Sequence, residues 1–165
     1  YLVTYILVFL KLNMQKIALF PGSFDPFTKG HETIVLKALQ IFDSIVIGIG
    51  TNTSKKCLFP IEKRIQHIEG IFKGNEKVSV IVYEGLTVNY CSENKIHHLI
   101  RGLRNTQDFE YETSIAHVNN SLTQIETVFF LTELKYSAIN SSIVREIFKS
   151  KGSIDSFVTH AELLV

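Results

Sequence analysis

The sequence predicts an α/β fold in which five parallel strands form one sheet with helices on both faces. Short apolar runs alternate with longer segments whose apolar residues recur at the helical period, which is typical of strand–helix–strand units. The chain has 165 residues, of which 45% are hydrophobic and 20% are charged. These values are ordinary for one globular domain that buries a sizeable core.

The expected elements follow one another in a regular order along the chain. A strand over 16–20 leads to a helix that starts near His31 and ends before Asp43, and a strand over 45–50 precedes a helix that Pro60 opens. Further strands are expected at 78–83, 97–102 and 127–131, and further helices at 86–94, 108–122, 140–148 and 154–159.

Polar motifs follow four of these strands. They lie at 23–31, 54–56, 101–104 and 136–142. Ligands of parallel α/β sheets bind beyond the carboxyl ends of the strands. We therefore expect the four motifs to meet in a single cleft.

The stretch from 20 to 31 reads F-P-G-S-F-D-P-F-T-K-G-H and joins the first strand to the first helix. A helix N-terminus offers unpaired N–H groups and the positive end of the helix dipole, which favours phosphate. Gly22 and Gly30 let the backbone approach a ligand closely, and Ser23 and His31 add side-chain donors. The stretch predicts a phosphate site, although His31 as a simple helix cap is the alternative.

Three further motifs supply candidate phosphate ligands, and each also has a simpler explanation. Arg101 and Arg104 present two guanidinium forks at a strand end, but surface ion pairs are the alternative. Ser54-Lys55-Lys56 supplies a cation, or only a solvated loop. Tyr136 to Ser142 places hydroxyl groups at a helix N-terminus, where plain capping is the alternative.

Composition and missing motifs exclude several classes of function. The net charge of +1 gives no basic field for nucleic acid. Neither a P-loop nor a G-x-G-x-x-G motif is present. Cys57, Cys91 and the pair His97-His98 have no metal-ligand spacing, so we expect buried or half-buried thiols, structural histidines and no metal-ligating residues.

The first 13 residues differ from the rest. They are apolar but too short to span a bilayer, and they lack the features of a signal peptide. We expect residues 1–13 to be an upstream leader, Met14 to be the natural start, and residues 14–165 to form a single domain. The alternative is an extra edge strand or a membrane-adjacent segment.

Four blocks, taken in order, resemble bacterial phosphopantetheine adenylyltransferases of the nucleotidyltransferase superfamily. They are G-S-F-D-P-F-T-K-G-H, S-K-K, L-I-R-G-L-R-N-T-Q-D-F-E-Y-E and Y-S-A-I-N-S-S, and the resemblance runs from Met14 to about Lys149. It implies a Rossmann-like fold of the nucleotidyltransferase type. It also implies transfer of the adenylyl group of ATP to 4′-phosphopantetheine, a Mg2+ cofactor, a cytoplasmic setting without membrane partners, and a homohexamer.

The resemblance further implies roles for single residues. His31 would stabilise the transition state, Lys55 and Arg101 would bind the acceptor phosphate and form the catalytic set with His31, and Thr87 would line the acceptor's arm. Ser23 would contact a phosphate of either substrate. The implied ATP-binding residues are Ser23, Phe24, His31, Gly102, Leu103, Arg104, Glu112, Tyr136, Ser137, Ala138, Ile139, Asn140, Ser141 and Ser142.

Three positions depart from the family pattern. Ser23 stands for the usual Thr, Tyr136 for a common Trp, and Asn140 for a Ser. Each retains the relevant property, which is a hydroxyl group, an aromatic face and a capping side chain, respectively. We therefore expect shifts in affinity and not a loss of activity.

The chemistry implied by the resemblance suits the residues present. A phosphate monoester has its second pKa near 6, so the acceptor is largely dianionic at neutral pH and needs no general base. The site must instead offer cations and N–H donors to the developing negative charge, with Mg2+ held mainly by the phosphates. Two alternatives stay open, namely a related transferase that uses CTP or nicotinamide mononucleotide, and a non-catalytic nucleotide-binding protein.

Overall fold

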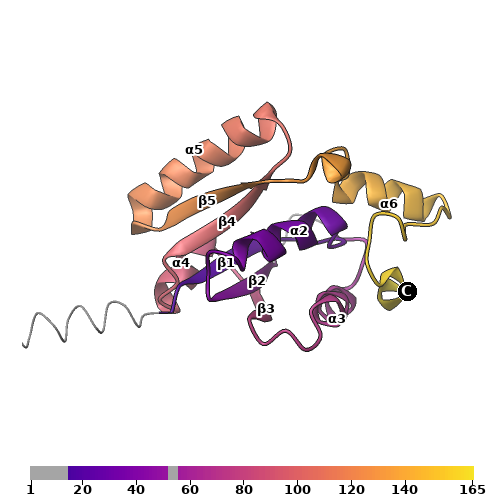
Figure 1. Cartoon of the computed structure of the whole chain (residues 1–165), viewed down its shortest axis with the longest axis horizontal. Helices are drawn as coiled ribbons and strands as arrows, with labels where there is room; N and C mark the ends of the chain where they lie inside the picture. Colours follow the sequence, from indigo (N-terminus) through magenta and orange to yellow (C-terminus); the bar gives the residue numbers. More distant parts are fainter. Residues whose placement is uncertain (1–14, 52–55) are drawn as a thin grey trace, which may run out of the picture.

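The computed structural model describes residues 15–51 and 56–165, so the expectations for residues 1–13, Met14 and Lys55 lie outside the described residues. One parallel sheet of five strands occupies the centre, in the order β3–β2–β1–β4–β5 (Figure 1). The strands are β1 (Ile17–Gly22), β2 (Ser44–Gly50), β3 (Val78–Tyr83), β4 (His98–Leu103) and β5 (Glu126–Leu131). The predicted α/β fold class is confirmed.

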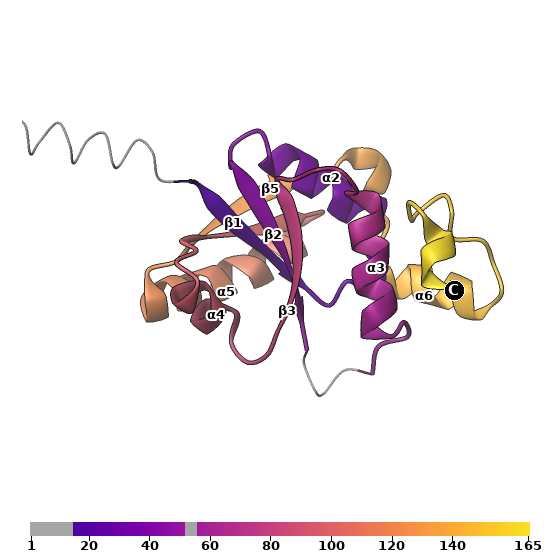
Figure 2. The same cartoon turned by 90° about the horizontal axis from the view of Figure 1, so that it is seen from below.

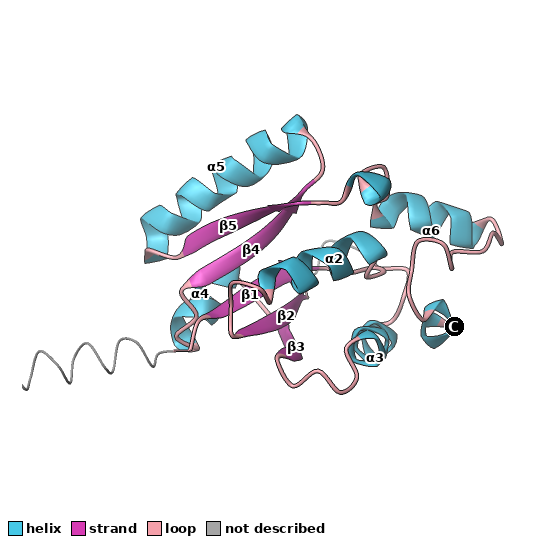
Figure 3. Ribbon diagram, viewed as in Figure 1, coloured by secondary structure: helices cyan, strands magenta, loops and turns pink. Residues whose placement is uncertain are grey.

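The helices cover both faces of this sheet and its carboxyl end (Figures 2 and 3). One face carries α2 (Lys29–Ala38) and α3 (Ile61–Ile71), and the other carries α4 (Thr87–Glu93) and α5 (Thr106–Thr123). Beyond the strand ends lie η1 (Leu134–Tyr136), α6 (Ser141–Lys149) and η2 (Ala161–Leu164). Within the described ranges, none of these helices combines the length and apolarity that crossing a membrane requires.

The alternation of side chains along β1 explains this two-sided packing. Successive residues of a strand point to opposite faces of its sheet. Ala18 and Phe20 accordingly join one buried cluster with Val35 of α2, while Leu19 joins a second with Cys91 of α4. The apolar residues of β1 therefore pack on both faces of the sheet, which is why the strand is a continuous apolar run in the sequence.

Two expected helices differ from the structure. The helix expected at 154–159 is wrong, because these residues form turns and the short helix η2 follows them. Ile154 and Val158 are buried against α6, and the Phe157 carbonyl accepts the Lys29 N–H at 2.9 Å. Their spacing thus reflects burial of an irregular segment. In addition, α2 ends at Ala38, several residues before Asp43, and tighter turns continue the chain.

The strand order places a switch point at the centre of the sheet. From β1 the chain moves outward to β2 and β3, then returns to place β4 and β5 on the other side of β1. The segments that leave β1 and β4 therefore diverge to opposite sides and open a crevice between them. The motifs at 23–31 and 101–104 leave the sheet at this crevice.

Candidate active site

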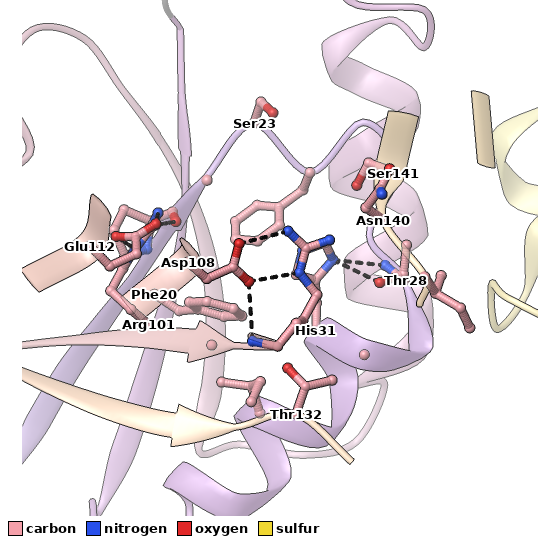
Figure 4. A pocket seen from close by; sticks show the side chains of 18 of the residues that line it. Phe20, Ser23, Thr28, His31, Arg101, Asp108, Glu112, Thr132, Asn140 and Ser141 are labelled. Atoms are coloured by element: carbon pink, nitrogen blue, oxygen red, sulfur yellow. Dashed lines mark hydrogen bonds and ion pairs between the residues drawn. The ribbon is translucent and has the colours of Figure 1, made fainter. Parts of the chain in front are cut away.

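A cavity of about 460 Å³ lies at this switch point (Figure 4). Its walls come from the loop after β1, the first turns of α2 and α5, the end of β4, and the start of α6. Sequence motifs that are more than a hundred residues apart thus share one cavity. The expected site residues that line it are Ser23, Phe24, His31, Arg101, Gly102, Arg104, Glu112, Ile139, Asn140 and Ser141.

The remaining expected residues lie elsewhere. Thr87 lines a second cavity of about 220 Å³, which shares Arg101, Glu112 and Tyr83 with the first. Lys55 falls outside the described residues, and Lys56 is exposed. Leu103 is buried in the sheet, and Tyr136, Ser137, Ala138 and Ser142 do not line either cavity.

His31 is fixed in one orientation by the start of its own helix. The Nδ1 atom accepts the backbone N–H of Thr28 at 3.0 Å, as Figure 4 shows. The rings of Phe20, Phe24 and Phe27 surround the imidazole, with centroid distances of 6.0, 5.3 and 5.3 Å. Because Nδ1 is an acceptor, the proton of the neutral ring resides on Nε2. His31 does cap its helix, but the cap uses only one ring nitrogen.

The surroundings of His31 also keep it uncharged. Burial, and to a smaller extent the positive charges of Arg101 and Arg104, together lower its pKa from 6.5 to about 4. Burial disfavours the charged imidazolium, and neighbouring cations repel it. At neutral pH the ring is therefore a neutral hydrogen-bond donor through Nε2–H.

Each arginine of the cavity is held by a carboxylate of α5. Arg101 donates Nε to Glu112 at 2.6 Å, forms a second bond to the same carboxylate, and donates Nη1 to the Pro21 carbonyl at 2.7 Å. Arg104 contacts both oxygens of Asp108, at 2.9 and 3.0 Å. Both ion pairs line the cavity, so the ion-pair alternative and a ligand-binding role are compatible.

Asp108 is a cavity residue that the sequence analysis did not single out. Burial alone would raise its pKa, but hydrogen bonds and charge from Arg104, with a smaller effect of Arg101, bring the pKa below its ordinary value. Asp108 is therefore ionised and orients Arg104, whose Nη1 has no hydrogen bond among the described residues. The signal was available, because Asp108 lies four residues after Arg104 at the start of a predicted helix.

The start of α6 closes the opposite wall of the cavity. Asn140 is the N-cap, and its Oδ1 accepts the N–H of Ile143 at 2.9 Å. Ser141 donates its hydroxyl to the Pro26 carbonyl at 2.9 Å. The capping expected for this segment is confirmed, and the Ser141 bond ties α6 to the loop after β1.

At the β1–α2 loop, one backbone N–H and one space beside a glycine that we expected to be open to a ligand are already occupied by the protein itself. The N–H of Lys29, the first residue of α2, donates to the Phe157 carbonyl and is not unpaired. A Cβ atom at Gly22 would lie 2.8 Å from the Phe24 ring. Gly22 therefore makes room for a side chain of its own loop, and not only for a ligand.

A cytidylyltransferase-like family model matches residues 19–147. The phosphopantetheine adenylyltransferase of Flavobacterium johnsoniae is 51% identical over 87% of this chain and 95% of its own length, and that of Cytophaga hutchinsonii is 47% identical over 89% and 99%. This chain belongs to the phosphopantetheine adenylyltransferase family. The family resemblance proposed from the sequence is thereby confirmed.

Solved structures with the same fold include other adenylyltransferases. A putative nicotinate-nucleotide adenylyltransferase from Vibrio parahaemolyticus has a TM-score of 0.64 at 21% identity, covering 92% of this chain and 99% of its own. A bifunctional NMN adenylyltransferase/ADP ribose pyrophosphatase from Francisella tularensis, complexed with AMP and a manganese ion, has a TM-score of 0.64 at 20% identity, covering 91% and 48%. At these identities the likeness concerns the fold shared across the superfamily.

The carboxylates that line the cavity bear on how a metal ion could be held there. Among the described residues, no group of three or more His, Cys, Asp or Glu side chains forms a metal-binding cluster. The two carboxylates of the cavity, Asp108 and Glu112, are both paired with arginines. This donor set fits an ion that is carried mainly by phosphate oxygens and keeps most of its waters.

Proposed function

We propose that this chain transfers the adenylyl group of ATP to 4′-phosphopantetheine, forming dephospho-CoA and pyrophosphate in coenzyme A biosynthesis. The observation that carries the proposal is the neutral His31 ring, which shares a cavity with Arg101 and Arg104 at the switch point of the sheet. Membership of the phosphopantetheine adenylyltransferase family supports the choice of donor and acceptor.

The reaction is a direct, in-line displacement at the α-phosphorus of ATP. An oxygen of the acceptor's dianionic phosphate forms the new P–O bond, and the bond to the β-phosphate oxygen breaks with its electron pair leaving on pyrophosphate. No general base is required, because the acceptor phosphate is already ionised near neutral pH. His31 is unsuited to be a base, since Nδ1 is hydrogen-bonded to Thr28 and the pKa is about 4.

Transition-state stabilisation falls to groups that donate hydrogen bonds or carry positive charge. We assign the Nε2–H of His31 to the oxygens of the reacting phosphoryl group, and Arg101 with Lys55 to the attacking phosphate. Donors that are preorganised at such oxygens contribute about 10²–10³ each to the rate. Glu112 keeps Arg101 in place, so its side chain needs little reorganisation during the reaction.

The two cavities suggest how the substrates divide the site. The acceptor would lie on Ser23, Lys55, Thr87 and Arg101, with its arm in the second cavity, because Arg101 lines both spaces. ATP would occupy the first cavity. Its proposed contacts in that cavity are Ser23, Phe24, His31, Gly102, Arg104, Glu112, Ile139, Asn140 and Ser141. Contacts with Leu103, Tyr136, Ser137, Ala138 and Ser142 rest on the family resemblance alone, because these side chains do not line the cavity.

Mg2+ is the proposed cofactor, and it would enter bound to the ATP phosphates. When bound, it neutralises part of the triphosphate charge and so lowers the repulsion between the two substrates. Arg104 acts on the same charge from the protein side, where Asp108 orients its guanidinium group.

We also propose a cytoplasmic homo-oligomer, specifically a homohexamer. The support is α5, none of whose residues is buried in the single chain although it is fully within the described part. Tyr111, Ile115, Val118 and Leu122 repeat at spacings of four, three and four, and they are exposed by 67, 37, 58 and 63%. Such an apolar stripe is typical of a helix that packs against another chain. Val118→Asp should lower the mass measured by light scattering below that of the unchanged protein.

A pyrophosphate-release assay tests the proposed reaction. ATP with 4′-phosphopantetheine should release pyrophosphate, while CTP in place of ATP, or nicotinamide mononucleotide in place of the acceptor, should release little. Labelled ATP alone should leave no covalent adenylyl group on the protein. Equal turnover with the other acceptor would favour the related-transferase alternative, and binding without turnover would favour the nucleotide-binding alternative.

A further inference from the structure

Arg64 is a buried cation that has no carboxylate partner in the described part of the chain. It lies in the first turn of α3, and only 6% of the residue is exposed. Its Nε donates to the Phe59 carbonyl at 3.1 Å, and its Nη1 donates to the Ser23 carbonyl at 2.5 Å. No ion pair among the described residues includes it. A buried charge is costly, and apolar side chains often stabilise a fold better, so stability alone explains Arg64 poorly.

The two carbonyl groups that Arg64 binds belong to two different segments of the site. Ser23 lies in the loop after β1, and Phe59 lies just before α3. Asp25 links the same segments in the complementary way, because its carboxylate accepts the N–H groups of Leu58 and Phe59 at 2.8 and 2.9 Å. Arg64 thus binds the carbonyls and Asp25 the amides, which fixes the loop after β1 from two sides.

The Ser23 carbonyl is part of the peptide that also carries the Phe24 N–H. In a planar trans peptide these two groups point in opposite directions. Arg64 does not line the large cavity, whereas Ser23 and Phe24 do. Phe24 has a φ of 45°, an uncommon backbone conformation for a residue with a side chain, and no hydrogen bond within the described ranges uses its N–H.

We infer that Arg64 is a positioning residue: by holding the Ser23 carbonyl away from the cavity, it directs the Phe24 N–H into the cavity, where this amide binds a polyphosphate oxygen of the nucleotide. The inference rests on the proposed function for the identity of the nucleotide. The amide itself requires only a polyphosphate, so it can be tested without an acceptor or turnover.

Calorimetric titration with inorganic triphosphate provides the first test. Arg64→Lys keeps the charge but cannot span both carbonyls, and we expect its dissociation constant for triphosphate to rise about tenfold, which is the loss of about 1.4 kcal/mol. Arg64→Gln should lose at least as much. Lys63→Gln removes a neighbouring charge whose Nζ contacts the Val165 carbonyl at the surface, so it should stay within about twofold of the unchanged protein. Binding by both Arg64 variants within twofold would overturn the inference.

A second measurement uses the unaltered protein and tests the Phe24 amide directly, so that the inference can still be refuted if the Arg64 variants do not fold. In a nitrogen-15-labelled sample, triphosphate should shift the Phe24 amide resonance strongly and the amides of α4 only slightly. An unmoved Phe24 resonance at saturating triphosphate would overturn the inference. Steady-state kinetics separate this result from the proposed reaction, because triphosphate binding can respond to Arg64 even if 4′-phosphopantetheine is not an acceptor.

Discussion

The helices α2 and α5 both carry groups of the proposed active site, but they are supported very differently. In α2, Gly30, Ile34, Val35 and Ala38 are buried against the sheet. In α5, which has 18 residues and lies wholly in the described part, none is buried within the single chain. The helix with His31 is thus secured by its own chain, while the helix with Asp108 and Glu112 presents an apolar stripe to the outside.

This difference separates two kinds of site residue. In the proposed reaction His31 acts directly on the reacting group, and its position depends on packing that one chain completes. In the same proposal the carboxylates of α5 act through Arg101 and Arg104, which they hold, and their helix has no residue that is buried within the single chain. We therefore expect the rate of the chemical step to depend on α2. The affinity for substrates should depend more on α5 and on the two arginines from the end of β4 that α5 holds.

The largest expected effect concerns α2. His31→Ala should lower kcat about 10²–10³-fold, as for other preorganised donors to a developing negative charge. The affinity for ATP should stay within a few fold, because the missing donor acts mainly in the transition state. Pyrophosphate release under saturating substrates measures kcat, and calorimetry measures ATP binding. Near-normal turnover would mean that His31 only caps the helix.

The two arginines held by α5 should separate the substrates. Arg101→Ala should mainly raise KM for 4′-phosphopantetheine, because Arg101 lines both cavities, and Arg104→Ala should mainly raise KM for ATP. We expect an effect of at least about tenfold on the preferred substrate, since hydrogen bonds to charged groups contribute about 1.5–3 kcal/mol. Equal effects of both variants on both substrates would show that the arginines serve one common anion site.

Matched valine truncations compare the packing of the two helices. Val35→Ala in α2 should reduce the free energy of unfolding by about 2 kcal/mol, because Val35 is fully buried. Val118→Ala in α5 should cost less than about 0.5 kcal/mol in the dispersed chain. Urea titrations over a range of protein concentrations measure both. Any loss at Val118 should disappear on dilution if it arises from contact between copies, and a loss that persists would contradict the comparison.

The last prediction concerns the pH dependence of stability. The pKa of His31 is lowered to about 4 in the folded chain, so between pH 6.5 and 4 the unfolded chain binds the additional proton. This contribution to stability is complete above pH 6.5 and is lost as the pH falls toward 4. Unfolding free energies at pH 7 and 5 should differ less in His31→Gln than in the unaltered protein. If the two proteins lost the same unfolding free energy between pH 7 and 5, the pKa of His31 would not be lowered by its surroundings.

The sequence predicted the fold and many of the residues that line the cavity better than the groups that hold those side chains in place. Period and apolar runs identify β1 and α5 within two residues, because burial on a sheet face imposes those patterns. The prediction of a helix at 154–159 was wrong, because the apolar residues of this segment are fixed by contacts with α6 and α2, which are distant in the sequence. Arg64 was missed, although it interrupts the apolar face of α3 between Ile61 and Ile68. A charge on a buried face was the available signal.

The hydrogen bond from Thr28 to His31 has a consequence for the direction of the reaction. With one nitrogen engaged and the other carrying a proton, the ring can donate but has no vacancy to accept a proton from a substrate. The proposed step therefore involves no proton relay that must be reset between turnovers. The donors that meet the phosphoryl group are the same whether the phosphate of phosphopantetheine or pyrophosphate attacks. The same site should therefore also catalyse pyrophosphorolysis of dephospho-CoA, so that removal of pyrophosphate would favour the forward direction.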